Sequence, residues 1–362
     1  MANKNKSDLK NLLLKQYQLY PKMQLQDMVK LIYQNEFAGG HMIPDENESL
    51  KRLKDELHSL KKQGANKTIS QAFESIGNGL CRIHLSALEG RNIELETVNK
   101  FFVNTANSVK GSVEAFEEKL HVLRECCEEG SLPYSLQELE AYLKEYKNQG
   151  YPPVSHSDIY KALYSPAYRI VKEEYCRFFE LFDRIDALMK LDRHIYVAID
   201  GNSGAGKSTL ADLIGDVYDC NIFHMDDFFL TPDLRTEERL REAGGNVDYV
   251  RFKEEVIQGL KSGREFTYRP YNCQIMALED AIYVKPKKLN IIEGVYSLHP
   301  TLIDTYDLKV FMAIAPEEQS RRILERNGPI MHKRFINEWI PLENRYFEAL
   351  KIREKCDLVF EI

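Results

Sequence analysis

The feature that most constrains this chain is a glycine-rich segment, residues 201–208, which reads G-N-S-G-A-G-K-S. It directly follows the β-branched run at residues 195–200, and an amphipathic stretch begins near Lys207. The segment matches G-x-x-x-x-G-K-[ST], in which glycines turn backbone N–H groups inward and the following helix offers its positive end to an anion. We therefore predict a strand–loop–helix unit that binds phosphate groups, with a glycine-rich turn without nucleotide as the alternative.

Each part of this loop has an expected task if the phosphates belong to ATP. Lys207 reaches the β- and γ-phosphates, and the Ser208 hydroxyl is a ligand of Mg²⁺. The residues expected to contact the nucleotide are Gly201, Asn202, Ser203, Gly204, Ala205, Gly206, Lys207, Ser208 and Thr209. ATP and Mg²⁺ are therefore the expected cofactors.

The hydrophobic pattern changes near the middle of the 362-residue chain. In the first half the apolar residues recur at helical spacing, as in Leu53, Leu57 and Leu60. In the second half, short β-branched runs alternate with amphipathic stretches, as a parallel sheet covered by helices on both faces requires. We expect an all-α domain at residues 1–190 and a doubly wound α/β domain with a parallel sheet at residues 191–362.

Charge and composition narrow the class of protein. The net charge of -7 argues against a protein that coats nucleic acid, because such binding needs concentrated Lys and Arg. No run approaches the roughly 18 apolar residues of a membrane span, and the first 20 residues lack the apolar stretch of a signal peptide. The seven cysteines form no C-x-x-C pair, which indicates reduced thiols. We expect a cytoplasmic chain without nucleic-acid or membrane partners, and the oligomeric state stays open, a homo-oligomer included.

Two further apolar runs end in acidic residues. Asp226 and Asp227 follow one run, and Glu293 ends the other. Since the carboxyl ends of parallel strands share one edge of a sheet, we expect these side chains beside the phosphate loop. Asp226 can take a proton from an acceptor hydroxyl, Asp227 can assist the metal, and Glu293 can face Mg²⁺ directly or through water. The alternative is a strand-end turn with solvated acids.

The sequences GNSGAGKST, MDDFF and IIEG together resemble the uridine kinase and phosphoribulokinase branch of P-loop kinases, and DDFF is also similar to nicotinamide riboside kinases. The resemblance covers about residues 192–362 and includes residues 246–252 and 269–272, which are similar to acceptor-side segments of the family. It implies a P-loop kinase domain in which the aspartate matched by Asp226 is the general base. Where uridine kinases tend to have Tyr-Asp, this chain has Tyr-Asn at residues 271 and 272.

The resemblance also reaches residues 321–328, RRILERNG, which are similar to the arginine-bearing lid of that family. The family's lid arginines contact ATP phosphates, and a planar donor fork suits the charge spread over a transferring phosphoryl group. The family lid usually reads R-R-x-x-R-D, so the chain leaves open which of Arg321, Arg322 and Arg326 meets the phosphates. We assign catalysis to Arg322 and Arg326, with an exposed arginine-rich helix as the alternative.

The first half carries three polar, glycine-containing clusters, at residues 35–41, 76–84 and 156–160, followed by Tyr164, Tyr168 and Arg169. They can line one pocket, or the glycines can be helix caps and the histidines satisfied core groups. A zinc site from His41, His84 and His156 lacks the usual ligand spacing. The hypothesis for this half is acceptor specificity, an effector site or a second activity.

Taken together, these patterns predict an ATP-dependent kinase that transfers the γ-phosphoryl group to a hydroxyl of a small molecule, with a nucleoside as the expected acceptor. A vitamin or a sugar is the alternative acceptor. The alternative class is a nucleotide-dependent regulator whose output is the helical half. Against a GTPase switch, the chain has no N-K-x-D guanine signature.

Overall fold

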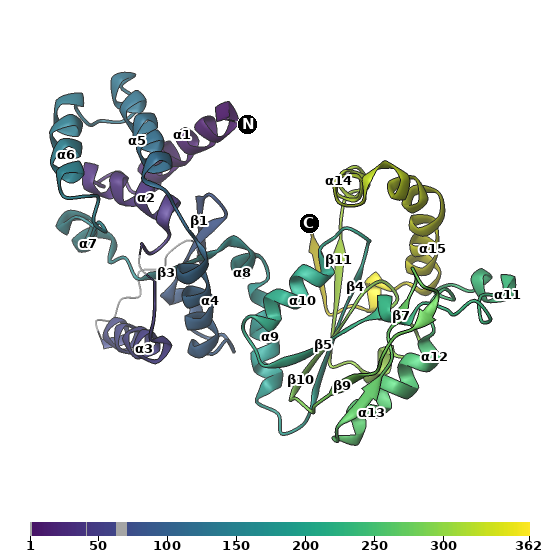
Figure 1. The fold of residues 1–362 in the computed structure, drawn as a ribbon. Coiled ribbons are helices and arrows are strands. Elements are labelled where there is room, and N and C mark those ends of the chain that lie inside the picture. The colour runs from purple at the N-terminus through teal and green to yellow at the C-terminus, as the bar shows by residue number, and fades with distance from the viewer. Residues whose placement is uncertain (1, 41, 63–70) are drawn as a thin grey trace. The chain divides into compact units, whose positions relative to one another are not determined.

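The structure is a computed structural model that describes residues 2–40, 42–62 and 71–362. The chain divides into two compact units, Met1–Asp183 and Arg184–Ile362, which we describe separately (Figure 1). Helix α9 (Phe179–Met189) runs across this division. The division lies a few residues before the boundary at residues 190 and 191 that the hydrophobic pattern predicts. Within the described ranges, no helix combines the length and the apolar character needed to cross a membrane.

A five-stranded parallel sheet forms the centre of the second unit. Its strands lie in the order β12-β11-β4-β10-β5, and every neighbouring pair is parallel. Their bounds are β4 (Ile195–Gly201), β5 (Cys220–His224), β10 (Leu289–Glu293), β11 (Leu308–Ala313) and β12 (Leu358–Glu361). Because every residue of β4 and β10 is buried, their apolar runs are continuous rather than alternating.

Helices cover both faces of this sheet. On one face, α10 (Lys207–Gly215) packs against β4, β5 and β10. On the other face, Ala198 of β4 shares a buried cluster with Phe252 of α12 (Tyr249–Phe252) and Tyr346 of α15 (Ile340–Leu350). The predicted doubly wound parallel α/β fold is confirmed.

One long helical segment leaves the sheet after β11 and returns to it at β12. It consists of α14 (Pro316–Arg334), the π-helical turn η5 (Phe335–Trp339) and α15, and we call it the lid segment. Gly328, with φ 73° and ψ 173°, breaks the helical conformation inside α14. Figure 1 shows the lid segment as an arch beside the sheet.

The other elements of the second unit are short. They are η2 (Met225–Phe228), α11 (Glu237–Arg241), η3 (Lys253–Ile257), α13 (Gln258–Ser262), β6 (Phe266–Tyr268), β7 (Tyr271–Asn272), β8 (Ala277–Leu278), β9 (Ile282–Val284), η4 (Ile303–Thr305) and η6 (Arg353–Lys355). β6 pairs with β9 and β7 pairs with β8, both antiparallel, between β5 and β10 in the chain.

The first unit is mainly helical, but the sequence pattern predicts an all-α domain, and the structure contains a small sheet as well. Its helices are α1 (Ala2–Leu19), α2 (Leu25–Phe37), α3 (Glu46–Lys62), η1 (Leu85–Leu88), α4 (Leu95–Ser108), α5 (Val113–Glu128), α6 (Leu136–Asn148), α7 (Asp158–Tyr164) and α8 (Glu173–Arg177). Between them lies an antiparallel sheet of β1 (Phe73–Gly77), β2 (Leu80–His84) and β3 (Tyr168–Lys172). β2 is buried along its whole length although it contains Arg82 and His84, so it shows no apolar–polar alternation. That is why these strands read as polar clusters in the sequence.

Candidate active site

The phosphate loop lies between the end of β4 and the first turn of α10, where the motif predicts it. Gly201 has φ 132°, and a Cβ at this position would come within 2.1 Å of the Met312 carbonyl oxygen. Gly206, with φ 91°, precedes the first residue of α10. Glycine is therefore required at residue 201 by the close approach of β11, and at residue 206 by a left-handed backbone turn into the helix.

The side chain of Lys207 lies across this loop. It is 8% exposed, and its Nζ donates to the carbonyl oxygens of Gly201 at 2.9 Å and Asn202 at 3.0 Å. The ammonium group is therefore held by the loop that the motif assigns to phosphate.

Ser208 and Glu293, both predicted to face Mg²⁺, are in contact. Ser208 Oγ donates to Glu293 Oε1 at 3.1 Å, and Glu293 is 4% exposed at the end of β10. A hydroxyl and a carboxylate are oxygen ligands of the kind that Mg²⁺ takes beside substrate phosphates, so the pair fits the metal. His224, which the sequence analysis does not assign, lies with Nδ1 2.5 Å from the same oxygen. This hydrogen bond raises the pKa of His224 above its ordinary value, against the effect of burial.

Asp226 and Asp227 lie on η2, directly after β5 and at the same edge of the sheet as the loop. Asp226 is exposed, yet the surrounding protein partly desolvates its carboxyl group and raises its pKa. The charge of Glu293 adds to this rise, while Lys207 and Arg326 oppose it. Burial also raises the pKa of Asp227. The structure thus brings the predicted base into the electrostatic range of the loop lysine and of the predicted metal ligand.

Two buried carboxylates that the sequence analysis does not assign support the loop. Asp200, 0% exposed, accepts hydrogen bonds from Gly201 N at 2.7 Å and Tyr346 Oη at 2.9 Å. Burial raises the pKa of Asp200 to about 6, although these hydrogen bonds oppose the rise. Glu343 of α15 accepts hydrogen bonds from the backbone N and the Oγ of Ser203. Asp200 ends an apolar run and so left a local signal, whereas Glu343 left none.

The three lid arginines differ in their surroundings. Arg321 is ion-paired with two glutamates of its own helix, and its side chain is 54% exposed. Arg322 binds one of these glutamates at 2.7 Å, and its Nη1 lies 3.4 Å from the carbonyl oxygen of Gly204 in the loop. The charge of Arg326 is among those that lower the pKa of Asp226. Arg322 and Arg326, the two arginines assigned to catalysis, therefore lie toward the loop and the acid.

The expected acceptor-side segments brace the turn that carries the two aspartates. Arg251 donates to the carbonyl oxygens of Asp227 at 3.0 Å and Arg269 at 2.6 Å, and its guanidinium lies 4.2 Å from the ring centre of Phe228. Arg269 in turn donates to the carbonyl oxygens of β8 and the residue after it. Arg251 thus holds the backbone of η2 directly, and Arg269 joins the segment that Arg251 contacts to β8.

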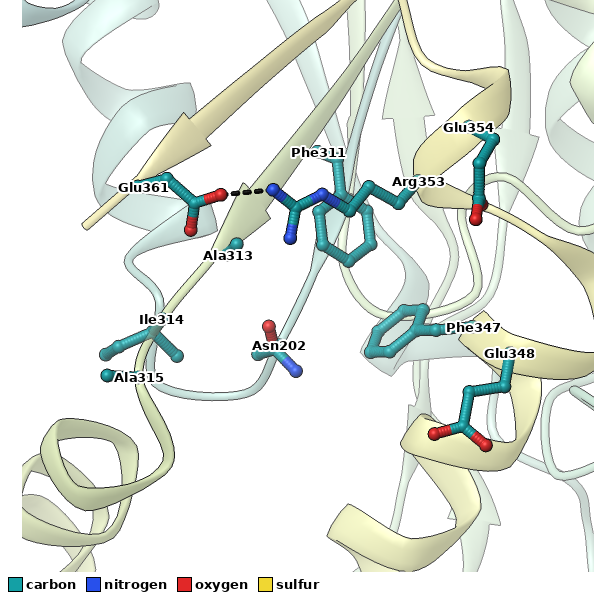
Figure 2. A pocket seen from close by; sticks show the side chains of 10 residues that line it. All are labelled: Asn202, Phe311, Ala313, Ile314, Ala315, Phe347, Glu348, Arg353, Glu354 and Glu361. Atoms are coloured by element: carbon teal, nitrogen blue, oxygen red, sulfur yellow. Dashed lines mark hydrogen bonds and ion pairs between the residues drawn. The ribbon is translucent and has the colours of Figure 1, made fainter.

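A pocket of about 380 Å³ adjoins the loop on the β11 and β12 side (Figure 2). Asn202 of the loop forms part of its wall. The other lining residues are Phe311, Ala313, Ile314, Ala315, Phe347, Glu348, Arg353, Glu354 and Glu361. Figure 2 shows the ion pair between Arg353 and Glu361 along one side of the pocket. The pocket thus combines apolar surface with carboxylates next to the phosphate loop.

Two of the three polar clusters of the first unit, at residues 76–84 and 156–160, contribute to one buried network. Arg82, 2% exposed, donates to Glu74 Oε1 and to Gln34 Oε1, both at 2.6 Å. Gln34 donates to Tyr168 Oη at 3.0 Å, and His156 Nε2 lies 2.6 Å from the same hydroxyl. These contacts support the interpretation of satisfied core groups, because the side chains bind one another.

His84 and His156, the two members of the candidate zinc site that the structure describes, bind separate partners. His84 Nε2 lies 3.2 Å from Glu74, and His156 Nδ1 lies 2.9 Å from Asp27, so each contacts a different carboxylate. His41 lies outside the described residues. In the part of the chain that the structure describes, no group of three or more His, Cys, Asp or Glu side chains is arranged to hold a metal ion.

Comparison with known proteins finds matches that each cover half of this chain or less. No family model matches the chain. Over 144 residues the chain is 27% identical to a phosphoribulokinase from Synechocystis, a match that covers 38% of this chain and 43% of that protein. A possible uridine kinase from Bacillus stearothermophilus aligns with a TM-score of 0.39 at 23% identity, over 50% of this chain and 99% of that one. A shikimate kinase from Bacteroides thetaiotaomicron aligns with a TM-score of 0.27 at 17% identity, over 46% of this chain and 86% of that one.

The parallel sheet, the phosphate loop and the carboxylates at its edge define the second unit as a P-loop kinase fold. The fold is of the uridine kinase and phosphoribulokinase type, which confirms the resemblance seen in residues 192–362. The match to phosphoribulokinase spans less than half of that relative's length.

Proposed function

We propose that this protein is an ATP-dependent phosphotransferase that moves the γ-phosphoryl group to a hydroxyl of a small molecule. The observation that carries the proposal is the grouping, at one edge of the sheet, of Lys207, the Ser208–Glu293 pair and the exposed Asp226. Binding a nucleotide requires only the loop and its metal ligands. Asp226 adds a group that can take a proton from an acceptor.

Each residue has a separate task in this reaction. Lys207 and the inward N–H groups of the loop bind the phosphates, and Ser208 and Glu293 would hold Mg²⁺. When bound, Mg²⁺ supplies positive charge to the phosphate oxygens. Asp226 accepts the proton of the acceptor hydroxyl on its carboxylate. Arg322 and Arg326 donate hydrogen bonds to the phosphoryl oxygens as charge spreads over them.

The pocket of Figure 2 is our candidate for the base of the nucleotide. It shares Asn202 with the loop, so a ligand whose phosphates lie in the loop can extend into it. Phe347 offers apolar surface to a flat ring, and Glu348 is a carboxylate that can accept a hydrogen bond from an exocyclic amine.

The expected acceptor is a nucleoside, because the resemblance is to uridine kinases. A vitamin or a sugar is the second candidate, since Asn272 stands where uridine kinases tend to have an aspartate. Asn272 Nδ2 donates to Glu279 Oε1 at 2.5 Å, so this amide is held by a neighbouring acid. Nucleic acid and membranes are not partners in this proposal.

Screening nucleosides, vitamins and sugars with Mg–ATP, with ADP release as the readout, tests the proposal. We expect one class of acceptor to stimulate ADP release, and Lys207→Ala to abolish the stimulated rate. Slow ADP release that no acceptor accelerates would favour the nucleotide-dependent regulator, with the first unit as its output. A protein that binds no ATP would contradict both functions.

A further inference from the structure

A buried carboxylate occupies part of the phosphate loop itself. Glu343 is 4% exposed, and its Oε2 accepts a hydrogen bond from Ser203 N at 3.0 Å. Its Oε1 accepts a hydrogen bond from Ser203 Oγ. One anionic group thus holds both donors of a single loop residue, which is the way in which such loops capture phosphate oxygens.

Charged groups of the phosphate loop and of η2 act on Glu343. Burial raises the pKa of Glu343, the positive charge of Lys207 and the hydrogen bonds from Ser203 oppose this rise, and the negative charge of Asp226 adds to it. Glu343 is therefore in electrostatic range of both the loop lysine and the proposed base. The terminal phosphate of ATP must lie between these two groups if it is to be transferred.

Both helices of the lid segment, α14 and α15, contact Ser203 of the phosphate loop. At the α14 end, Gln319 Nε2 donates to Ser203 O at 2.9 Å. At the α15 end, Glu343 binds Ser203 from the other side, and Tyr346, one turn further on, is bonded to the buried Asp200. These hydrogen bonds connect Ser203 to both α14 and α15.

We propose that Glu343 is a positioning residue, an internal anion that holds Ser203 in the nucleotide-free protein and is displaced by the terminal phosphate of a nucleoside triphosphate. This inference rests on the proposed function. A carboxylate and a triphosphate repel each other when they share a few donors, so ATP and Glu343 compete for Ser203. A diphosphate lacks the terminal group and leaves the Glu343 contact in place. The protein then distinguishes ATP from ADP through the position of α15.

Titration calorimetry on the full chain, with Mg–ATP and Mg–ADP and no acceptor, tests this. Glu343→Gln keeps the shape of the side chain and one oxygen that can accept from Ser203 N, replaces the other oxygen with an amide NH₂ that can donate to Ser203 Oγ, and removes the charge. We expect ATP affinity to rise about tenfold, equivalent to about 1.4 kcal/mol, with little change for ADP. The matched control is Glu338→Gln, which removes an exposed carboxylate of the lid segment that pairs with Arg334. This control should leave both affinities unchanged.

The outcomes separate this inference from the proposed function. If the wild-type protein binds neither nucleotide, the proposed function fails, and the inference fails with it. If both nucleotides bind and Glu343→Gln changes neither affinity, or changes both equally, only the inference is overturned.

A second readout needs no variant. Trp339 is the single tryptophan of the sequence and lies just before α15, with its ring 4.5 Å from that of Phe335. We expect Mg–ATP, but not Mg–ADP, to change its fluorescence. Identical spectra with both nucleotides at saturation would overturn the proposal even if Glu343→Gln fails to fold.

Discussion

At Asp226, surface exposure and a raised pKa occur together, as a group that must exchange a proton with a bound acceptor requires. We predict that Asp226→Asn lowers acceptor-dependent turnover by a factor of about 10² to 10⁴, because the amide cannot take the hydroxyl proton. ATP binding, measured by calorimetry, should be retained, since Lys207 and Ser208 are untouched. Asp233→Asn, a change at an exposed aspartate in the following loop, is the control. An Asp226→Asn protein with normal turnover would refute the assignment of the base.

Asp200 makes the stability of the fold depend on pH. Burial raises its pKa to about 6 from an ordinary value of 3.8, so the folded state binds a proton more tightly than the unfolded state does. This contribution to stability is complete below the unfolded pKa and is lost as pH rises to about 6. The loss is on the order of 2 to 3 kcal/mol.

The comparison with Asp200→Asn, which does not titrate, isolates this effect. We predict that the unfolding free energy of the wild type minus that of the variant decreases from pH 4 to about pH 6 and is constant at higher pH. Urea unfolding at several pH values provides the measurement. A difference that does not vary with pH would show that Asp200 titrates normally.

At the scale of single residues, the sequence correctly predicted that residues far apart in the chain meet at one edge of the parallel sheet. Ser208 and Glu293 are far apart in the chain, yet each ends or follows a strand of the same parallel sheet, so topology alone places them together. Glu343 could not be found in this way. Its contact with Ser203 depends on which face of α15 is turned toward the loop, and no local sequence pattern predicts that orientation.

Among the elements, α14 offers a matched pair of adjacent arginines. Arg322 reaches the Gly204 carbonyl oxygen, whereas Arg321 is bound to glutamates of its own helix. We predict that Arg322→Ala lowers kcat by about 10²-fold or more, the scale of losing one preorganised donor, and that Arg321→Ala has little effect. Steady-state kinetics on both variants measures this. Equal losses in the two variants would mean that the helix contributes only structural stability.

The sequence predicted the strands of the second unit but not those of the first unit. The central strands of the second unit were predicted because both of their faces are buried, which produces continuous apolar runs. β1, β2 and β3 were missed because polar side chains interrupt their apolar residues, among them the buried Glu74, Arg82 and His84. The helical spacing of the surrounding segments then dominated the pattern.

At the scale of the whole molecule, the residues assigned to the nucleotide all lie in the second unit. We predict that a fragment beginning at Phe179, which keeps α9 whole, folds and binds Mg–ATP with the affinity of the full chain. Circular dichroism and calorimetry check the two statements. A folded fragment that no longer binds ATP would contradict the assignment of the nucleotide site to this unit alone.

The same fragment addresses the first unit, whose role the resemblance leaves open. If its kinetics with the acceptor equal those of the full chain, acceptor specificity is excluded as the task of residues 1–178, which the fragment lacks. A changed KM for the acceptor at an unchanged KM for ATP would support it.

The buried pair of Arg82 and Glu74 has a consequence for how the first unit can change over time. Their side chains are 2% and 4% exposed, and Gln34, Tyr168, His84 and His156 belong to the same network. Losing one member of a buried ion pair costs about 3 to 5 kcal/mol, whereas replacing the whole set with well-packed apolar residues is often neutral. A lineage that drifts one substitution at a time therefore meets a barrier here. Variants of this unit should carry either the complete network or a complete apolar replacement, with few intermediates between them.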